Sequence, residues 1–534
     1  MRVAIGDALE RRRRWLGGTF VKNQSGLVCI SVLVALFMCC SARAQLIDNT
    51  QAPNTAKAGI NKSLADEIGA GRGDIMTPYS SLFIINRDPF RAIRRGRQIF
   101  QRKFTREQGQ GPNNGDGHGD INTIGGIGAG LSDSCAGCHG RPRGAGGVGG
   151  DVPTRPDSRD APHLFGLGIR EMLADEITTD LRAIRTQAIG EAQAKHQPVR
   201  KNLVSKNISY GSITANPDGT VDTSNVNGVN ADLRVRPFFA EGSTISIREF
   251  LVGAFRNEMG LEAADPDLLT ASSGGKVTTP SGMVLDGTTD RIEAPPISDP
   301  GSDPDGDRVT NEMPVSLVDY MEYYLLHYFK PGVYKQTQQT DRGRKMFAKI
   351  GCASCHIANL QIDHDRRVAD VDTVYDPVHG NFNNLFATAT AFFNSVDDGS
   401  GFPALKQPKQ QSFLVTDIYT DFKRHDVGPG FYERNYDGTI TKQFMTRPLW
   451  GVGSTSPYGH DGRSINLDEV ILRHGGEAQT SRDAYAHLED EDSAAINAFL
   501  NSLIIFPPED TASNLDPGNR TAPNFPQFGH GSVK

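Results

Sequence analysis

Two short motifs constrain this chain more than any other feature. The segment "CAGCH" ends at His139 and the segment "CASCH" ends at His356, and both have the form C-x-x-C-H. In this spacing two thiols can form thioether bonds to the vinyl groups of a haem, while the adjacent histidine ligates the iron. The sequence therefore predicts two covalently bound c-type haems. His139 and His356 are the expected proximal iron ligands, and the expected attachment sites are Cys135, Cys138, Cys352 and Cys355.

The use of cysteine supports the haem interpretation. The chain has seven cysteines, and the three outside the motifs are Cys29, Cys39 and Cys40, which lie in an apolar N-terminal stretch. Four cysteines in an exported protein would ordinarily suggest two disulfides, and one C-x-x-C alone could serve redox chemistry or zinc. Two C-x-x-C-H motifs that use every remaining cysteine favour haem instead.

Residues 1–44 resemble a secretory signal peptide. Four arginines at 11–14 precede the apolar run "GLVCISVLVALFMCC", and Ala42-Arg43-Ala44 offers a cleavage site before Gln45. The apolar run is shorter than the roughly 20 residues that span a bilayer, although an uncleaved anchor is the alternative. We expect a periplasmic or secreted protein whose mature chain has no transmembrane segment, in the compartment where c-type haem is attached.

The charge balance excludes one class of partner. The chain carries 56 basic and 63 acidic residues, a formal net charge of −7. Binding to phosphate backbones needs a basic surface, so nucleic acid is not an expected partner. The acidic balance is compatible with a basic redox partner.

Periodicity and composition predict a mainly α-helical fold. We expect two cytochrome-c-like haem domains in a pseudo-twofold arrangement, with a small β excursion (208–236) and long loops. Helices are predicted over 88–105, 159–177 and 316–329, and a Pro/Gly/Asp-rich stretch over 262–312 reads as a surface insertion. The expected segments are a signal peptide (1–44), an irregular leader (45–85), a haem-1 domain with an insertion (86–335), a haem-2 domain (336–505) and a Pro-rich tail (506–534).

An internal repeat follows the two haem motifs. The segments "EGSTISIREFLVGAFRNEMG" (241–260) and "HDGRSINLDEVILRHGG" (460–476) share a glycine, a capping residue, an aliphatic residue and a glutamate. Ser246 with Glu249, and Asn466 with Glu469, are expected to cap the two helices. Glycines are expected to end both helices.

The apolar face of each repeated helix ends in one polar residue that could act at iron. This residue is Glu258 in the first segment and His474 in the second. A solvated glutamate and a packed core histidine are the plain alternatives. Near a haem, a carboxylate suits general acid–base work on bound peroxide or O₂, whereas a histidine would complete a six-coordinate electron-transfer centre.

The whole pattern resembles the di-haem c-type peroxidase superfamily. The resemblance is carried by the paired motifs, "EMG", "LFGLG", "HDVGPG", "PLWGVG", "HDGR" and "HGGEA", and it covers residues 85–505. It is closest to the di-haem oxidoreductase branch, to which the bacterial rubber oxygenases are related.

The resemblance implies roles for several residues. His474 falls where the peroxidases place a distal methionine, which implies bis-histidine ligation and a lower potential, because a thioether ligand raises it. Glu258 falls on the active-site glutamate of the family. Trp450 lies in the segment that runs between the haems and could relay electrons, although a packed core tryptophan is an equal alternative.

Departures from the family pattern affect the predicted reaction. A Phe-Trp-Asp-Gly stretch of the peroxidases is replaced here by "PFFAEG" (237–242), and Phe238 and Phe239 would make the pocket more apolar. This change favours oxygenation of an apolar substrate. The histidine that caps haem 1 in resting peroxidases has no clear counterpart, with His163 as the candidate.

The sequence offers two further candidate sites outside the repeat. Asp303, Asp305 and Asp307 stand at positions 1, 3 and 5 of a calcium-type loop, with Asn311 at position 9. Arg308 replaces the turn glycine and Pro314 the twelfth-position glutamate, so a solvated acidic turn is the alternative. His425, Asp426 and His460 are expected to support iron ligands, or to be structural.

The predicted activity is reduction of H₂O₂, or oxidation of a small organic substrate with peroxide. A small cytochrome or a cupredoxin is the expected redox partner. Oxygenation of an apolar substrate by O₂ is the second hypothesis, and a non-catalytic electron-transfer cytochrome is the third.

Overall fold

The computed structural model describes residues 63–111, 132–141, 146–152, 157, 159–328, 331–371, 389–435 and 437–505. The predicted signal peptide, the first part of the leader and the Pro-rich tail lie outside these ranges. Within the described ranges, none of the helices has the length and apolar character needed to cross a membrane.

The leader is more regular than expected. Between Ser63 and residue 85 the chain forms the short helix α2 and most of α3, each capped by a serine side chain that accepts an amide hydrogen bond. The predicted helix over 88–105 is confirmed as α4, with Asp88 as its cap and Pro89 in its first turn. The bounds of these elements are α2 Leu64–Ile68, α3 Ser81–Arg87, α4 Pro89–Gln101 and α5 Cys135–Cys138.

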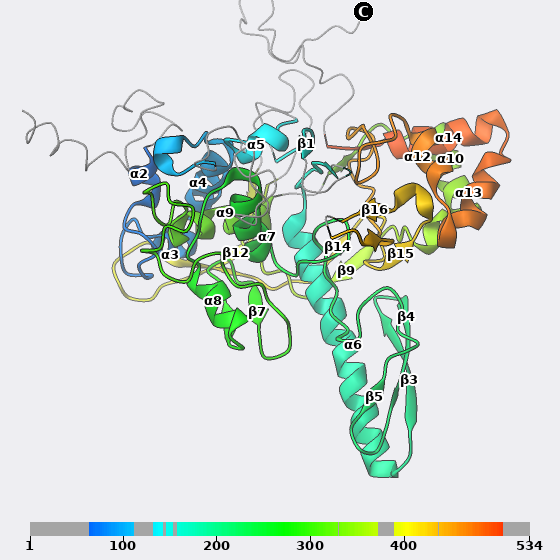
Figure 1. The fold of residues 1–534 in the computed structure, drawn as a ribbon, viewed down its shortest axis with the longest axis horizontal. Coiled ribbons are helices and arrows are strands. Elements are labelled where there is room, and N and C mark those ends of the chain that lie inside the picture. Colours follow the sequence, from blue (N-terminus) through cyan, green and yellow to red (C-terminus); the bar gives the residue numbers. More distant parts are fainter. Residues whose placement is uncertain are drawn as a thin grey trace, which may run out of the picture. The chain divides into compact units, whose positions relative to one another are not determined.

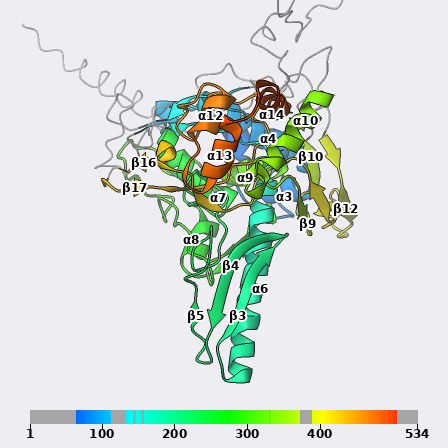
Figure 2. The same ribbon diagram turned by 90° about the vertical axis from the view of Figure 1, so that its right-hand side faces the viewer.

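A long helix and a small sheet follow. The helix predicted over 159–177 begins later, at Leu167, and continues to Lys195 as α6. An antiparallel sheet lies alongside it, in the order β3-β4-β5, as both ribbon views show (Figures 1 and 2). Ala188 and Ala192 are fully buried in this part of α6. Because both side chains are small, the sequence shows little hydrophobic periodicity here, and the predicted helix was therefore too short. The strands are β3 Val199–Ser205, β4 Ile208–Ala215 and β5 Val221–Asp222.

The stretch 262–312 is not only a surface insertion. It contains a short helix and a hairpin, and Leu268, Met283 and Leu285 are buried there. The predicted helix over 316–329 is confirmed as α9. The elements are α7 Ile247–Ala254, α8 Pro266–Ser272, β6 Lys276–Thr278, β7 Val284–Asp286 and α9 Val315–His327.

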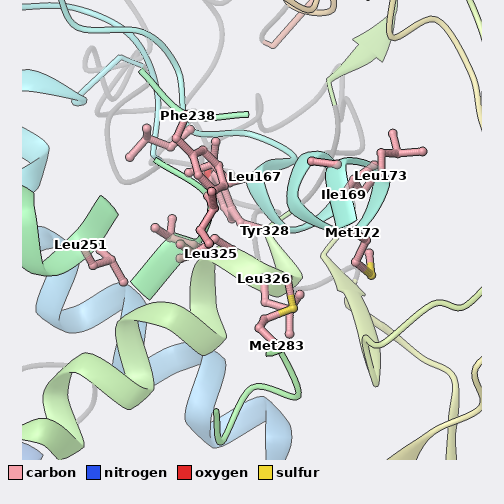
Figure 3. Close-up of a cluster of buried hydrophobic side chains, with 14 of the residues drawn as sticks. Leu167, Ile169, Met172, Leu173, Phe238, Leu251, Met283, Leu325, Leu326 and Tyr328 are labelled. Carbon is pink, nitrogen blue, oxygen red and sulfur yellow. The ribbon is translucent and has the colours of Figure 1, made fainter. Parts of the chain in front are cut away.

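The main core forms where α6, α7 and α9 meet. Figure 3 shows Leu167 of α6 near Leu325 of α9, and the same cluster of buried residues includes Leu173 and Leu326. The backbones of α6 and α9 approach closely, because a Cβ on Gly168 would lie 2.2 Å from the carbonyl oxygen of Leu326. Each large apolar side chain buried here contributes about 1.5–3 kcal/mol, so this core holds α7 firmly.

A buried ion cluster fastens the start of α7. Arg248 is fully buried and donates to Asp265 at 2.9 Å, to Asp319 at 3.0 Å and to Glu322 at 2.8 Å. Asp265 caps α8, whereas Asp319 and Glu322 lie on α9. The cluster therefore ties α7, α8 and α9 together around one guanidinium.

The C-terminal part has its own smaller core. Helices α10 and α14 cross at Gly343, where a Cβ would lie 1.9 Å from the carbonyl oxygen of Ala495. Phe347 and Phe499 pack at this crossing. The helices are α10 Gln338–Lys349, α12 Leu467–Arg473, α13 Gln479–Ala486 and α14 Asp490–Asn501.

The described residues form more strands than the single small β excursion that the sequence predicted. Beyond β3-β4-β5 and the pair β6-β7, they form two-stranded antiparallel ladders. Strands of two to four residues are too short to show a readable alternation, so the sequence did not reveal them. The pairs are β1 Asp151–Val152 with β2 Arg159–Asp160, β8 Gly332–Val333 with β19 Leu503–Ile504, β9 Leu360–Ile362 with β14 Phe413–Val415, β10 Ala369–Val371 with β11 Ala389–Ala391, β12 Phe393–Val396 with β13 Leu405–Pro408, β15 Arg424–Asp426 with β18 Gln443–Met445, and β16 Glu433–Arg434 with β17 Ile440–Thr441.

Candidate functional site

The second C-x-x-C-H motif forms a tight turn directly after α10. Gly351 has φ of +92°, which starts the turn that carries Cys352 and Cys355. The four cysteines of the described residues are all free thiols, which speaks against two disulfides. The Nδ1 atom of His356 lies 3.0 Å from the carbonyl oxygen of Tyr419. This hydrogen bond fixes the ring and leaves Nε2 to a ligand.

His474 lies across a pocket from this motif. Asn466 caps α12 as predicted, and His474 is the residue that ends the helix. Its Nδ1 atom lies 2.7 Å from the carbonyl oxygen of Val470, so its Nε2 is also left to a ligand. His474, His356 and both thiols line one pocket. Burial lowers the pKa of His474, and it lowers that of His356 to about 4, which keeps both rings in the neutral form that binds metals.

Two guanidinium groups line the same pocket. Burial lowers the pKa of Arg170 to about 9, helped by repulsion from Arg447. Burial also lowers the pKa of Arg447 to about 10. The Nε atom of Arg170 has no partner among the described residues, while its Nη2 donates to the carbonyl oxygen of Pro237. Buried cations need anionic partners, and the two carboxylates of a haem would supply them. The residues of this pocket therefore fit a haem.

The first C-x-x-C-H motif repeats the arrangement of the proximal histidine. Cys135–Cys138 form the single turn α5, and the Nδ1 atom of His139 lies 2.6 Å from the carbonyl oxygen of Pro162. Burial lowers the pKa of His139 to about 4. Nε2 is again left to a ligand, so this motif also fits a haem on its proximal side. The glycine-rich stretch 112–131, which precedes Cys135, lies outside the described residues.

Glu258 lies in a π-helical turn beside this motif. The predicted cap is confirmed, because the Ser246 hydroxyl accepts from the amide of Glu249 at 3.1 Å. The α-helix ends at Ala254, however, and Phe255–Met259 form a π-turn that ends at Gly260 with φ of +66°. The half-buried Glu258 lies close enough to Cys138 for its charge to help burial raise the pKa of that thiol.

Met259 also lies at the first motif, next to Glu258. The sequence did not reveal this position of Met259. Its sulfur lies 3.9 Å from the Sγ atom of Cys135. π-turns are rare and often mark functional sites. The two repeated helices thus begin alike and end differently.

Trp450 and His163 connect the surroundings of the two motifs. Trp450 is buried, lines the pocket of His356 and packs against Gly166. The Nε2 atom of His163 lies 3.1 Å from the carbonyl oxygen of Trp450, and the preceding residue, Pro162, accepts from His139. This hydrogen bond engages one ring nitrogen of His163, and its role as the cap of haem 1 stays a prediction. Burial lowers its pKa to about 3 and keeps it neutral.

The three residues expected to support iron ligands line or border the pocket. His425 lies between Asp421 (2.9 Å) and Glu477 (2.8 Å). Burial opposes its protonation, but Asp421, Cys355 and Glu477 raise its pKa to about 11. Both ring nitrogens are hydrogen-bonded to these two carboxylates. The Asp426 amide donates to Glu477, which follows His474 closely. His460 stacks on a phenylalanine at the other side of the pocket, with ring centroids 4.2 Å apart.

Phe238 and Phe239, which were predicted to make the substrate pocket more apolar, pack against a third phenylalanine. Phe238 is fully buried in the core, and both rings pack on Phe250 with centroid distances of 5.8 and 5.3 Å. A cleft of about 1160 Å³ runs along α7 and is lined by polar groups that include Arg256 and Arg424. None of the predicted iron ligands faces this cleft.

The C-terminal part of the chain matches a known family. The sequence profile described as "Di-haem oxidoreductase, putative peroxidase" matches residues 380–503, which include Trp450 and His474. The match confirms the resemblance to di-haem oxidoreductases and supports an oxidoreductase that uses haem. A comparison with curated proteins gives no match.

Two solved structures show a distant likeness. Hydrazine synthase of Kuenenia stuttgartiensis, pressurised with xenon, is 16% identical over 37% of this chain, with a TM-score of 0.22. This chain covers 58% of the hydrazine synthase chain. A MauG-like protein associated with microbial copper homeostasis is 14% identical over 63% of this chain and 88% of its own, also with a TM-score of 0.22. Likenesses at this level carry no argument about activity.

Proposed function

We propose that this chain, whose residues 380–503 belong to the di-haem oxidoreductase family, is an exported, peroxidase-like enzyme with two covalently attached c-type haems. One observation carries the proposal. Two neutral histidines, His356 and His474, line a pocket with two free thiols, one buried arginine and one half-buried arginine, and each histidine is oriented by a backbone carbonyl. This is the donor set of a six-coordinate haem.

The haem at the second motif would serve electron transfer. Both axial positions would be filled by imidazoles, so no position would be open to a substrate. Arg170 and Arg447 would hold its propionates and thereby lose the mutual repulsion that lowers their pKa values.

The haem at the first motif would be the reactive one, since it has the carboxylate of Glu258 nearby in place of a second histidine. A haem with one open position supplies one-electron redox chemistry and the activation of peroxide. Glu258 would take a proton from the incoming peroxide and return it to the leaving oxygen. The π-turn aims this carboxylate, and Gly260 allows the sharp return of the chain.

The two centres would exchange electrons through the Pro162-His163 segment, which is hydrogen-bonded to His139 at one residue and to Trp450 at the other. Pro162 accepts from His139, and the adjacent His163 bonds the backbone of Trp450, which lines the second pocket. The two hydrogen bonds of this connection are partly buried. A small cytochrome or cupredoxin is the proposed external partner.

The capped helices support a pseudo-twofold relation of two haem units. Ser246 and Asn466 accept from the amides of Glu249 and Glu469, at 3.1 and 2.9 Å. Each capped helix follows one C-x-x-C-H motif and ends near iron-competent residues. Export rests on the N-terminal signal pattern and on the compartment in which c-type haem is attached.

Spectroscopy of the haem-loaded protein tests the proposal. We expect one low-spin, bis-histidine haem and one haem with a high-spin state, and rapid two-electron oxidation by H₂O₂. Glu258→Gln keeps the size of the side chain, and it should slow this oxidation at least about 100-fold, the lower end for general acid–base catalysis. Glu469→Gln, at an exposed cap of the other repeat, is the matched control.

Other outcomes would select the alternatives. Two low-spin haems in both redox states would leave only an electron-transfer cytochrome. A stable complex with O₂ in air, together with slow reaction with H₂O₂, would point to oxygenation of an organic substrate.

A further inference from the structure

The three aspartates of the predicted calcium loop lie together between β7 and α9. Asp303, Asp305 and Asp307 each have an oxygen atom within 4.8 Å of the others. The amides of Gly306 and Arg308 donate to Asp303 at 2.9 and 3.0 Å, and any acidic turn can make such hydrogen bonds. Calcium at this loop therefore stays a prediction from the sequence.

The cleft along α7, called the α7 cleft below, is a better-defined site. Its volume of about 1160 Å³ is slightly above the range of about 300–1,000 Å³ that is usual for small-molecule sites. The helix α7 and the π-turn form one wall through Glu249, Val252 and Arg256. The paired strands β15 and β18 form another wall through Arg424 and Gln443. The cleft is therefore built from segments that are far apart in the sequence.

The α7 cleft is lined by more cations than acids. Nine charged side chains of the described residues line it, and five of them are cationic. The cations are Arg236, Arg256, Arg291, Arg424 and Lys442, and the acids are Glu241, Glu249, Glu293 and Asp426.

Three of the four acids are engaged by other groups. Glu241 pairs at 3.0 Å with Arg159, which does not line the cleft. Asp426 accepts from a tyrosine hydroxyl at 2.9 Å. Glu249 accepts from a backbone amide at 3.0 Å, and burial raises its pKa to about 7, so it carries only part of its charge at neutral pH. These contacts leave the exposed Glu293 as the acid that can neutralise the cations of the cleft.

Arg424 and Arg236 lie close together in the α7 cleft. Arg236 pairs with Asp232 at 2.6 Å, and Arg424 donates to the side-chain oxygen of Asn230, two positions earlier in the same segment. The amide of Arg424 also donates to the carbonyl oxygen of Gly228 at 2.9 Å. These bonds hold β15 against this segment, so both guanidinium groups lie in the same part of the cleft.

The half-buried guanidinium of Arg424 has an uncharged partner. Among the described residues, its side chain donates to the amide oxygen of Asn230 and forms no ion pair. Burial lowers the pKa of Arg424, and repulsion from Arg236 adds to this effect, against the opposing charge of Asp232. A guanidinium has five N–H donors, so several of them remain for a ligand. An anion between the two guanidinium groups would stabilise both.

The lining of the cleft favours an organic anion. Guanidinium groups bind carboxylates through two parallel hydrogen bonds. The buried side chains of Val252, Leu268 and Ile292 also line the cleft, and these apolar groups suit a carbon skeleton. The volume leaves room for several carbon atoms beyond one carboxylate.

We propose that the α7 cleft binds a small organic anion with two or more carboxylate groups, one of which Arg424 and Arg236 hold together. A second carboxylate meets the cations of the other lining segments, which include Arg256 in the π-turn and Arg291 in the loop after β7. This binding goes beyond the proposed haem reaction and does not depend on it, because the predicted iron ligands do not line the cleft.

Isothermal titration of the full-length, haem-loaded protein with citrate tests the site. Citrate is a probe with three carboxylates, and it should bind once per chain with a Kd of about 1 mM or lower. Trimethyl citrate, which keeps the skeleton without the charges, and inorganic phosphate should each bind at least about tenfold more weakly. Arg424→Gln should weaken the binding of citrate at least about tenfold, as expected for the loss of one charge-assisted hydrogen bond.

Arg200→Gln is the matched control for Arg424→Gln. The exposed Arg200 also bonds an uncharged partner, the Ser212 hydroxyl, at 3.0 Å, but it lies on the sheet of β3 and β4. Thermal unfolding separates loss of binding from loss of folding. Without citrate, both variants should unfold at about the temperature of the wild type, because neither loses an ion pair. Citrate should raise the unfolding temperature of the wild type and of Arg200→Gln, but not that of Arg424→Gln.

Arg236→Gln is a second variant of the site. It should also weaken the binding of citrate, because it removes one of the two cations and frees Asp232 to pair with Arg424. Calorimetry records binding and not haem oxidation, so a failure of the proposed haem reaction is distinguishable from a failure of this site. The proposal is overturned if citrate does not bind to the wild type, or if trimethyl citrate or phosphate binds as tightly as citrate. It is also overturned if Arg424→Gln and Arg236→Gln bind citrate as tightly as Arg200→Gln does.

Discussion

The Arg248→Met substitution tests how much the buried ion cluster at the start of α7 contributes to folding. The guanidinium donates charge-assisted hydrogen bonds to three acids, Asp265, Asp319 and Glu322. At about 1.5–3 kcal/mol each, these bonds sum to about 5–9 kcal/mol. Part of this loss is recovered, because burial already raises the pKa of Glu322 to about 7 and the freed acid can bind a proton. The net loss should then be about 3–5 kcal/mol, as for other broken buried ion pairs.

The assay is urea unfolding of the haem-loaded protein at pH 7, followed by far-UV circular dichroism. Arg342→Met is the control, since Arg342 is exposed and bonds Asp492 at 2.7 Å on the surface between α10 and α14. An exposed pair contributes less than about 1 kcal/mol. Equal losses in the two variants would refute the reasoning that burial sets the energy of the Arg248 cluster.

Three further predictions concern the haem pocket and the capped helices. His474→Met should raise the reduction potential of the low-spin haem, within the roughly 0.8 V range that axial ligands cover, as measured by spectroelectrochemistry. Arg170→Met should lower the same potential by tens of millivolts, on the order expected for one unit charge at an effective dielectric constant of about 20; an unchanged potential would mean that Arg170 does not face the haem. Burial raises the pKa of Glu249 to about 7, so the folded protein binds more protons than the unfolded chain between about pH 4.5 and 7, and stability falls as pH rises through this window. Glu249→Gln should remove up to about 1.4 kcal/mol per pH unit of that slope, whereas Glu469→Gln, at the exposed cap, should keep it.

Local sequence signals were enough to predict where the capped helices begin and where the haem motifs lie. Ser246 and Asn466 were predicted as caps because a cap depends on residues within one turn, and the structure confirms both. The C-x-x-C-H motifs are equally local. The structure adds the carbonyl partners of His139, His356 and His474, which come from the folded surroundings or from the preceding turn of the helix.

Long-range packing decided what the sequence could not reveal. Arg170 and Arg447 are 277 positions apart, and nothing near either residue shows that they line one pocket. Leu360, Ile362 and further residues as far as Ile505 belong to the same core as α6 and α9, which no local pattern indicates.

The two capped helices also bear on how duplicated halves of a protein can acquire different tasks. One α-helical residue advances the chain by about 100° around the helix axis, so a turn that is one residue wider redirects every side chain after it. The π-turn at Phe255–Met259 is such a widening, and α12 has no equivalent. In the proposed function this widening separates the roles of the two helices, since Glu258 lies within the π-turn whereas His474 ends a regular α-helix.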